Sequence, residues 1–201
     1  MKKLVQSLVV FGTLLFVGCG SEPVNVVNTS PKEVYKEGEK LELKSVAGAK
    51  ITLVRTKEGF VIEGEEDKIV LIDIFGTFCV PCQEEAPFLM DFQLQNSEDV
   101  FLIGLNHLEE VSDEYVVENF AAKYNAYYFI SNAPQNKKIV ETIVQGIAYK
   151  QTLQVPFKVV LKEGIYQKVT DIYGGNPENK FYIGKVKLSV IQKDIDALKT
   201  K

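Results

Sequence analysis

The segment of residues 69–82 reads Ile69-Val70-Leu71-Ile72-Asp73-Ile74-Phe75-Gly76-Thr77-Phe78-Cys79-Val80-Pro81-Cys82. Its first half is a near-continuous apolar run, which is typical of a central strand covered on both faces of a sheet. Residues 83–95 carry apolar side chains at helical spacing, so the two cysteines lie where a strand gives way to a helix. Two thiols at such a junction can form and break a disulfide without movement of the backbone, and a helix N-terminus stabilises the thiolate form. The stretch therefore predicts a redox-active dithiol.

The rest of the chain alternates between predicted strands and predicted helices. After the dithiol, the sequence predicts a buried strand over 100–105, a helix over Ser112–Tyr124 with Ser112 as N-cap, a strand over 127–130 and a helix over 135–149. A last hairpin over 157–161 and 165–173 and a terminal helix from Leu188 to Leu198 follow, while 41–44, 51–54 and 60–62 predict an N-terminal β-hairpin region. This order of elements is typical of an α/β fold.

The first residues read as an export signal. Lys2 and Lys3 give a positively charged start, and residues 4–17 form an apolar stretch that is too short for a membrane span. The sequence therefore predicts a signal peptide over residues 1–18, which is removed and takes no part in the fold.

The following residues predict a membrane anchor and a tether. Residues 15–20 (Leu-Phe-Val-Gly-Cys-Gly) resemble a bacterial lipobox, which implies a lipid on Cys19; an ordinary signal peptide cut elsewhere is the open alternative. Residues 19–40 have neither helical nor strand period and predict a flexible tether. The remaining residues 41–201 fit one globular domain, which we expect to be monomeric.

The cysteine count and the net charge narrow the function. The chain has three cysteines, and lipidation of Cys19 leaves only Cys79 and Cys82, so no structural disulfide is possible. A disulfide that closes so small a loop restricts the unfolded chain little and so adds little stability. This favours a role in thiol-disulfide exchange over a structural role. The formal net charge of −4 becomes more negative once Lys2 and Lys3 are removed, so we expect no binding to nucleic acid.

The residues around the dithiol resemble the thioredoxin fold. Asp73, the Cys79-Val-Pro81-Cys82 motif, Glu85 and the later pair Val155-Pro156 are most similar to the exported, membrane-anchored thiol-disulfide oxidoreductases of the TlpA/ResA/CcmG type. The resemblance implies a central mixed β-sheet flanked by helices, with the N-terminal β-hairpin as an extension.

Each cysteine has an expected role. Cys79 precedes the first helical turn, where unpaired N–H groups and the helix dipole favour its anion, so we expect it to be the attacking sulfur. Cys82, one turn inside the helix, is expected to be less exposed and to resolve the mixed disulfide. A zinc site is disfavoured because it needs four ligands, and the single histidine, His107, is not accompanied by further cysteines. We interpret His107 as a loop residue.

The other site residues depend on the resemblance. Asp73 is an acid inside an apolar strand, and the resemblance implies that it lies buried beneath the disulfide and moves the proton of the resolving thiol; a strand-end aspartate that reaches solvent is the alternative. The resemblance also implies a cis peptide bond at Pro156 and pairing of the Val155 backbone with an extended substrate. Phe78 and Pro81 complete the expected substrate-binding residues.

Four positions depart from the family or stay open. Phe75 and Phe78 stand where the family commonly has tryptophan. The lysine that partners the buried acid in cytosolic thioredoxins has no evident counterpart, since Gly104 falls near its place. Glu85 either tunes the dithiol or is a solvated helix residue.

Together these features predict a lipid-anchored protein outside the cytoplasm that reduces disulfides of exported proteins and needs no cofactor. By resemblance, a membrane electron carrier of the DsbD/CcdA type would recharge it, and apocytochrome c is one plausible client. The alternatives are a disulfide-forming oxidase of the same fold and a Cu(I)-binding lipoprotein without enzymatic activity.

Overall fold

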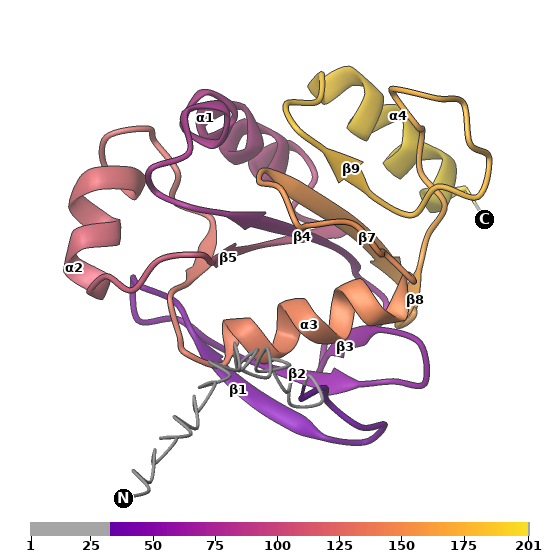
Figure 1. Cartoon of the computed structure of the whole chain (residues 1–201), viewed down its shortest axis with the longest axis horizontal. Coiled ribbons are helices and arrows are strands. Elements are labelled where there is room, and N and C mark those ends of the chain that lie inside the picture. Colours follow the sequence, from indigo (N-terminus) through magenta and orange to yellow (C-terminus); the bar gives the residue numbers. More distant parts are fainter. Residues whose placement is uncertain (1–32, 201) are drawn as a thin grey trace, which may run out of the picture. The chain divides into compact units, whose positions relative to one another are not determined.

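The computed structural model describes residues 33–200 and builds them around a mixed β-sheet (Figure 1). The strand order is β6-β5-β4-β7-β8, with β9 also paired to β7. The strands are β4 (Ile69–Phe75), β5 (Val100–Asn106), β6 (Phe129–Ser131), β7 (Phe157–Lys162), β8 (Ile165–Tyr166) and β9 (Tyr182–Ile183). β4 and β5 run parallel, as do β5 and β6, whereas β7 is antiparallel to β4. The predicted signal peptide, the predicted lipidation site Cys19 and most of the predicted tether lie outside the described residues.

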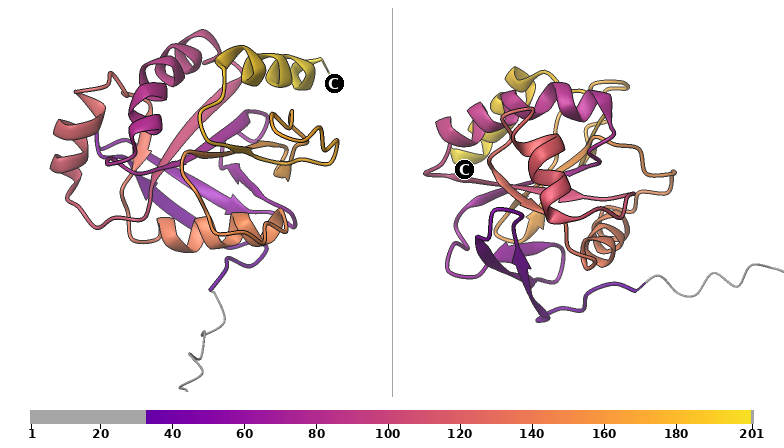
Figure 2. Two further views of the ribbon diagram at one scale, coloured as in Figure 1. Left: turned by 45° about the horizontal axis from the view of Figure 1, so that its top comes forward. Right: turned by 90° about the vertical axis from the view of Figure 1, so that its left-hand side faces the viewer.

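Helices cover both faces of this sheet. They are α1 (Val80–Gln95), α2 (Asp113–Val116) with the π-helical turn η1 (Val117–Ala121), α3 (Asn136–Gly146) and α4 (Leu188–Lys199). α1 and α4 lie on one face and α3 on the other, which the rotated views make plain (Figure 2). Every residue of β4 is buried, and successive side chains alternate between the two apolar clusters that these helices complete. The expected mixed central sheet flanked by helices is confirmed.

The N-terminal extension is a three-stranded antiparallel sheet. It consists of β1 (Lys40–Lys44), β2 (Lys50–Arg55) and β3 (Phe60–Ile62) in that order, one strand more than a hairpin. The buried side chains of Leu43, Leu53 and Phe60 pack into the apolar cluster on the α3 side of the central sheet. Tyr35 already contacts the domain, because its ring lies edge-on to Phe60 at 6.3 Å between centroids.

Several predicted elements are shorter in the structure than in the sequence pattern. Ser112 caps α2 as expected, with its hydroxyl accepting from the Tyr115 N–H at 3.1 Å, but the α-helix changes to π-helical hydrogen bonding after one turn. The predicted strand over 165–173 ends at Tyr166. Beyond it, the Asp171 carboxylate accepts from backbone N–H groups of Tyr173 and Asn176, so side-chain to backbone bonds replace a strand ladder there.

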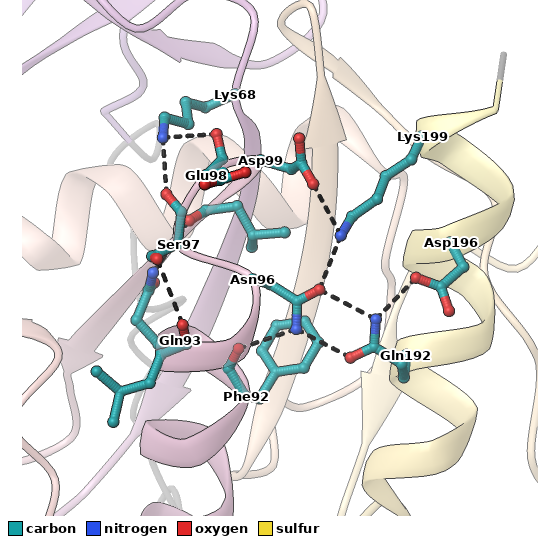
Figure 3. A network of polar contacts seen from close by, with 12 residues as sticks. Lys68, Phe92, Gln93, Asn96, Ser97, Glu98, Asp99, Gln192, Asp196 and Lys199 are labelled. Carbon is teal, nitrogen blue, oxygen red and sulfur yellow. Dashed lines mark hydrogen bonds and ion pairs between the residues drawn. The ribbon is translucent and has the colours of Figure 1, made fainter.

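A polar network binds the C-terminal end of α1 to α4 (Figure 3). The Asn96 side-chain amide donates to the Phe92 carbonyl oxygen and to Gln192 Oε1, both at 2.9 Å, and its oxygen accepts from Gln192 and from Lys199 Nζ. Lys199 also pairs with Asp99 at 2.9 Å. Because Asn96 is buried, these bonds satisfy an amide that would otherwise cost free energy, and they fix the end of the helix that carries the dithiol.

Candidate active site

The dithiol lies at the start of α1 and is closed as a disulfide. Cys79 and Cys82 are bonded, with their Cα atoms 5.2 Å apart. Cys79 is the N-cap residue of the helix, and its Sγ accepts a hydrogen bond from the Cys82 N–H at 3.3 Å. A thiolate formed at Cys79 would therefore keep the Cys82 N–H group as a donor and face the positive end of the helix dipole. Cys82 is less exposed than Cys79, at 3% against 7%.

The loop ahead of Cys79 is held by side chains from two elements. The Glu109 carboxylate, which follows β5, accepts from both the N–H and the hydroxyl of Thr77, and Gln83 of α1 donates to the Thr77 carbonyl oxygen at 2.6 Å. The Phe78 ring lies against Gly76, so closely that a Cβ atom on Gly76 would stand 2.6 Å from it. Phe78 is 57% exposed and thus forms an apolar surface next to the dithiol.

Three charged side chains meet between the sheet and α1, and we call Asp73, Glu85 and Lys158 the buried charge cluster. Asp73 on β4 and Lys158 on β7 stand directly opposite each other in the antiparallel ladder, so both point to the α1 face of the sheet. Lys158 Nζ lies 3.3 Å from Asp73 Oδ1 and 2.8 Å from Glu85 Oε2. The second oxygen of Glu85 accepts from the Val186 N–H at 2.8 Å. No member of the cluster is more than 4% exposed.

The expectation that the buried acid lacks a lysine partner was wrong. The position opposite Asp73 on β5 is indeed Gly104, but a Cβ atom there would stand 2.9 Å from the Tyr128 ring and 3.2 Å from the Phe75 ring. Those rings fill the space, and the ammonium comes from the strand on the other side of β4. The available signal was Lys158 itself, a lysine inside the apolar strand 157–161.

Burial excludes the solvated alternative for both Asp73 and Glu85, while their roles at the dithiol stay predictions. Asp73 does not reach solvent, and Glu85 is not a solvated helix residue, since both are buried. Glu85 follows Cys82 by three positions on α1, so both side chains lie on the face of the helix that packs on the sheet.

Burial dominates the ionisation of this cluster. It raises the pKa of Asp73 to about 6; the Lys158 ammonium opposes this rise and the Glu85 carboxylate adds to it. Burial lowers the pKa of Lys158, but the two carboxylates outweigh it, so that this pKa is raised and the ammonium stays charged. Burial, followed by the charges of Asp73 and Glu85, raises the pKa of Tyr128 well above its ordinary value, so its hydroxyl is neutral.

The segment that precedes β7 has the expected cis proline. The Val155–Pro156 peptide bond is cis, and the Pro156 carbonyl oxygen accepts from the Gly184 N–H at 2.8 Å. Val155 is half-buried and packs against the apolar cluster that contains both cysteines, whereas Pro81 is exposed at the start of α1. The cis bond is confirmed; contact of these residues with a substrate stays a prediction.

A cavity of about 880 Å³ opens beside the loop that precedes Cys79, at the carboxyl ends of β5 and β6. Its lining includes His107, Glu109, Lys137 and Glu141. His107 directly follows β5, as expected of a loop residue, and burial lowers its pKa. Because Glu109 lines the cavity and also holds Thr77, the cavity adjoins the active-site loop.

We expect the Asp73→Asn substitution to slow exchange and to change how stability depends on pH. Between pH 4 and pH 6 the folded protein keeps a proton on Asp73 that the unfolded chain has released, so the contribution of this group to stability is present below about pH 4 and lost as pH rises through 6. From pH 4 to pH 7 the wild type should therefore lose about 2–3 kcal/mol of its free energy of unfolding that the Asn variant does not lose.

Urea unfolding of both proteins at pH 4 and pH 7 measures this change. If the wild type instead gains stability relative to the Asn variant as pH rises, the pKa of Asp73 is not raised in the folded protein. Unchanged exchange kinetics in the Asn variant would remove Asp73 from the mechanism.

Comparisons with known proteins agree with this geometry. No family model matches the sequence. The thioredoxin-like protein YneN of Bacillus subtilis (strain 168) is 29% identical over 157 residues, which cover 76% of this chain and 85% of that protein. Thioredoxin H9 of Arabidopsis thaliana is 27% identical over 99 residues, 47% of this chain and 68% of that protein. The crystal structure of StoA from Bacillus subtilis superposes with a TM-score of 0.53 and 17% identity, covering 79% of this chain and 97% of that one, which confirms the expected fold.

Proposed function

We propose that this thioredoxin-like thiol-disulfide oxidoreductase reduces disulfides of exported proteins, while a lipid on Cys19 anchors it to the periplasmic side of a bacterial membrane. The observation that carries the proposal is the pairing of an N-cap dithiol with a buried acid on the same side of the sheet. Within residues 33–200, no helix is long and apolar enough to cross a membrane. The export signal and the lipobox-like segment support attachment through lipid.

The reaction begins with the reduced dithiol. The Cys79 thiolate attacks one sulfur of a client disulfide, a Cys79–client bond forms, the client S–S bond breaks, and the second client sulfur leaves as a thiolate that takes a proton from water. Cys82 then gives its thiol proton to the carboxylate of Asp73. The Cys82 thiolate attacks Cys79, which forms the intramolecular disulfide and expels the first client sulfur as a thiolate. The client gains two electrons and the dithiol loses two.

A membrane thiol carrier of the DsbD/CcdA type would return two electrons to the Cys79–Cys82 disulfide and complete the cycle. The resting disulfide is the form that such a carrier would reduce. Apocytochrome c is the client class that the resemblance suggests, because its thiols must be reduced before haem attachment.

The surface around the dithiol suits an extended client segment. Phe78 and Val80 flank Cys79 and are more than half exposed, and Pro81 is exposed on the first turn of α1. The backbone of Val155, ahead of the cis proline, could pair with the client's main chain, as an added strand does at a sheet edge. The apolar side chains would then contact the client's side chains.

The reduction potential of the soluble domain, measured by equilibration with glutathione, tests the direction of the reaction. A reductase should lie near the thioredoxin value of about −270 mV and should reduce insulin with dithiothreitol as electron source. A value near −120 mV would assign the oxidase function instead. Tight Cu(I) binding under anaerobic conditions with no insulin reduction would assign the copper-binding alternative.

A further inference from the structure

The buried charge cluster contains one more acid than base. With Asp73, Glu85 and Lys158 all ionised it would carry one negative charge on residues that are at most 4% exposed. An uncompensated charge in such surroundings is costly, and protonation of one carboxyl group removes it. The cluster is therefore built to hold one proton at the acidic end of the physiological range.

The two carboxylates differ in their hydrogen bonds. Glu85 accepts a bond on each oxygen, one from the Lys158 ammonium and one from the Val186 N–H, both at 2.8 Å. Asp73 Oδ1 is fully buried and, within the described residues, has no hydrogen-bond donor; the ammonium lies 3.3 Å away. Donors stabilise a carboxylate in its ionised form, and Glu85 has one on each oxygen where Asp73 Oδ1 has none.

We propose that Lys158 is a positioning residue that holds Glu85 as a permanent ion pair and thereby makes Asp73 the one carboxyl group of the cluster that binds and releases a proton. The direct contact of Lys158 is with the two acids; it acts on the dithiol only through Asp73. This assignment goes beyond the general use of a buried acid, because it gives the two acids of this chain different tasks.

The groups that face Asp73 come from every element packed around it. They are Lys158 of β7, Glu85 of α1 and the neutral Tyr128 hydroxyl ahead of β6, which is also buried and, among residues 33–200, without a hydrogen-bond partner. Of the two charged groups, Lys158 has the larger influence on Asp73 and Glu85 the smaller. The two influences have opposite signs, and this difference allows a test.

Carbon-13 NMR titration of the Asp73 carboxyl group in the oxidised protein is the experiment. Glu85→Gln removes the repelling charge and leaves the ammonium to Asp73 alone, so the titration midpoint should move to lower pH than in the wild type. Lys158→Met/Glu85→Gln leaves Asp73 buried without either charge, and its midpoint should move to higher pH. Lys158→Met alone should titrate as a coupled pair of acids in two steps.

The matched control is Glu84→Gln, which removes an exposed carboxylate from the same turn of α1; its ion pair with Lys185 is more than half exposed. It should leave the Asp73 midpoint unchanged. Midpoints of Glu85→Gln and the double variant that move in the same direction, or that stay with the wild type, would overturn the proposal. Should one variant fail to fold, the direction in which the Asp73 midpoint of the other variant moves from that of the wild type still tests the proposal.

For the role in turnover, the inference rests on the proposed function. The pH at which exchange reaches half its maximal rate should follow the same order, lowest for Glu85→Gln and highest for the double variant. The NMR titration needs no turnover, so it can fail or succeed independently of the insulin assay. If the Asp73 midpoint shifts as predicted but the pH dependence of exchange does not change, Lys158 affects only the ionisation of Asp73. That result would overturn the part of Lys158 in the reaction.

Discussion

Replacing Cys79 by serine is expected to abolish disulfide exchange, with a loss on the order of a thousandfold or more, because no other group can start the reaction. Cys79 is the N-cap of α1, and its sulfur accepts from the Cys82 N–H, so its anion is the one that the helix stabilises. Insulin reduction and the reduction of a small aromatic disulfide measure the loss.

The Cys82→Ser variant gives the matched result. It retains the attacking sulfur but cannot resolve the intermediate, so it should accumulate a mixed disulfide between Cys79 and the client that mass spectrometry detects. Retained exchange in Cys79→Ser, together with a mixed disulfide on Cys82, would reverse the two roles.

Replacing Lys158 by methionine is expected to destabilise the folded protein by about 3–5 kcal/mol at pH 7, because it leaves two carboxylates buried without their counter-charge. The side chain is fully buried and lies within 3.3 Å of both acids. The loss should shrink toward pH 4, where both carboxyl groups can take up protons. Urea unfolding of the oxidised protein at several pH values measures both effects.

Lys185→Met is the control for this prediction. Lys185 pairs with Glu84 at 2.8 Å, the same distance as Lys158 to Glu85, but both side chains are more than half exposed. An exposed pair is worth about 0–1 kcal/mol. Adding Glu85→Gln and Asp73→Asn to Lys158→Met should recover most of the lost stability, since no charge then remains in the site. Equal losses in Lys158→Met and Lys185→Met would show that the buried ammonium has no special energetic role.

The dithiol and the α/β fold class could be predicted because their signals are local, whereas the thioredoxin fold itself was expected from the family resemblance. A buried strand, two cysteines at a helix start and the alternation of strands and helices all lie within short windows of sequence. The cis bond at Pro156 needed the family resemblance, since an X-Pro bond is cis in only about 5–6% of cases. The change to π-helical bonding at Val117–Ala121 left no recognisable signal in the apolar periodicity.

The buried charge cluster could be predicted only in part, because it depends on strand register. Asp73 stands out in the sequence as an acid in an apolar run, and Glu85 follows Cys82 at helical spacing. Lys158, however, meets Asp73 only through the antiparallel pairing of β4 with β7, between segments far apart in the chain. A shift of one residue in that register would turn Lys158 to the opposite face of the sheet.

The place of the lysine is linked to the residue on the other side of β4. Asp73 has a neighbour on each side in the sheet, Gly104 on β5 and Lys158 on β7. An ammonium from either strand could reach the carboxylate. In this chain the rings of Tyr128 and Phe75 occupy the space on the β5 side. A side chain at position 104 has no room there, and the ammonium comes from Lys158 on the β7 side.

Cys79 is expected to be the acidic, attacking thiol of the pair, and its rate of alkylation by iodoacetamide across a pH series measures that acidity. In the reduced Cys82→Ser variant we expect rapid reaction already at pH 6–7, with a midpoint well below the ordinary thiol value of about 8.5, while Cys82 in the Cys79→Ser variant should react slowly over the same range. Two thiols that react equally slowly, each with a midpoint near 8.5, would contradict the account.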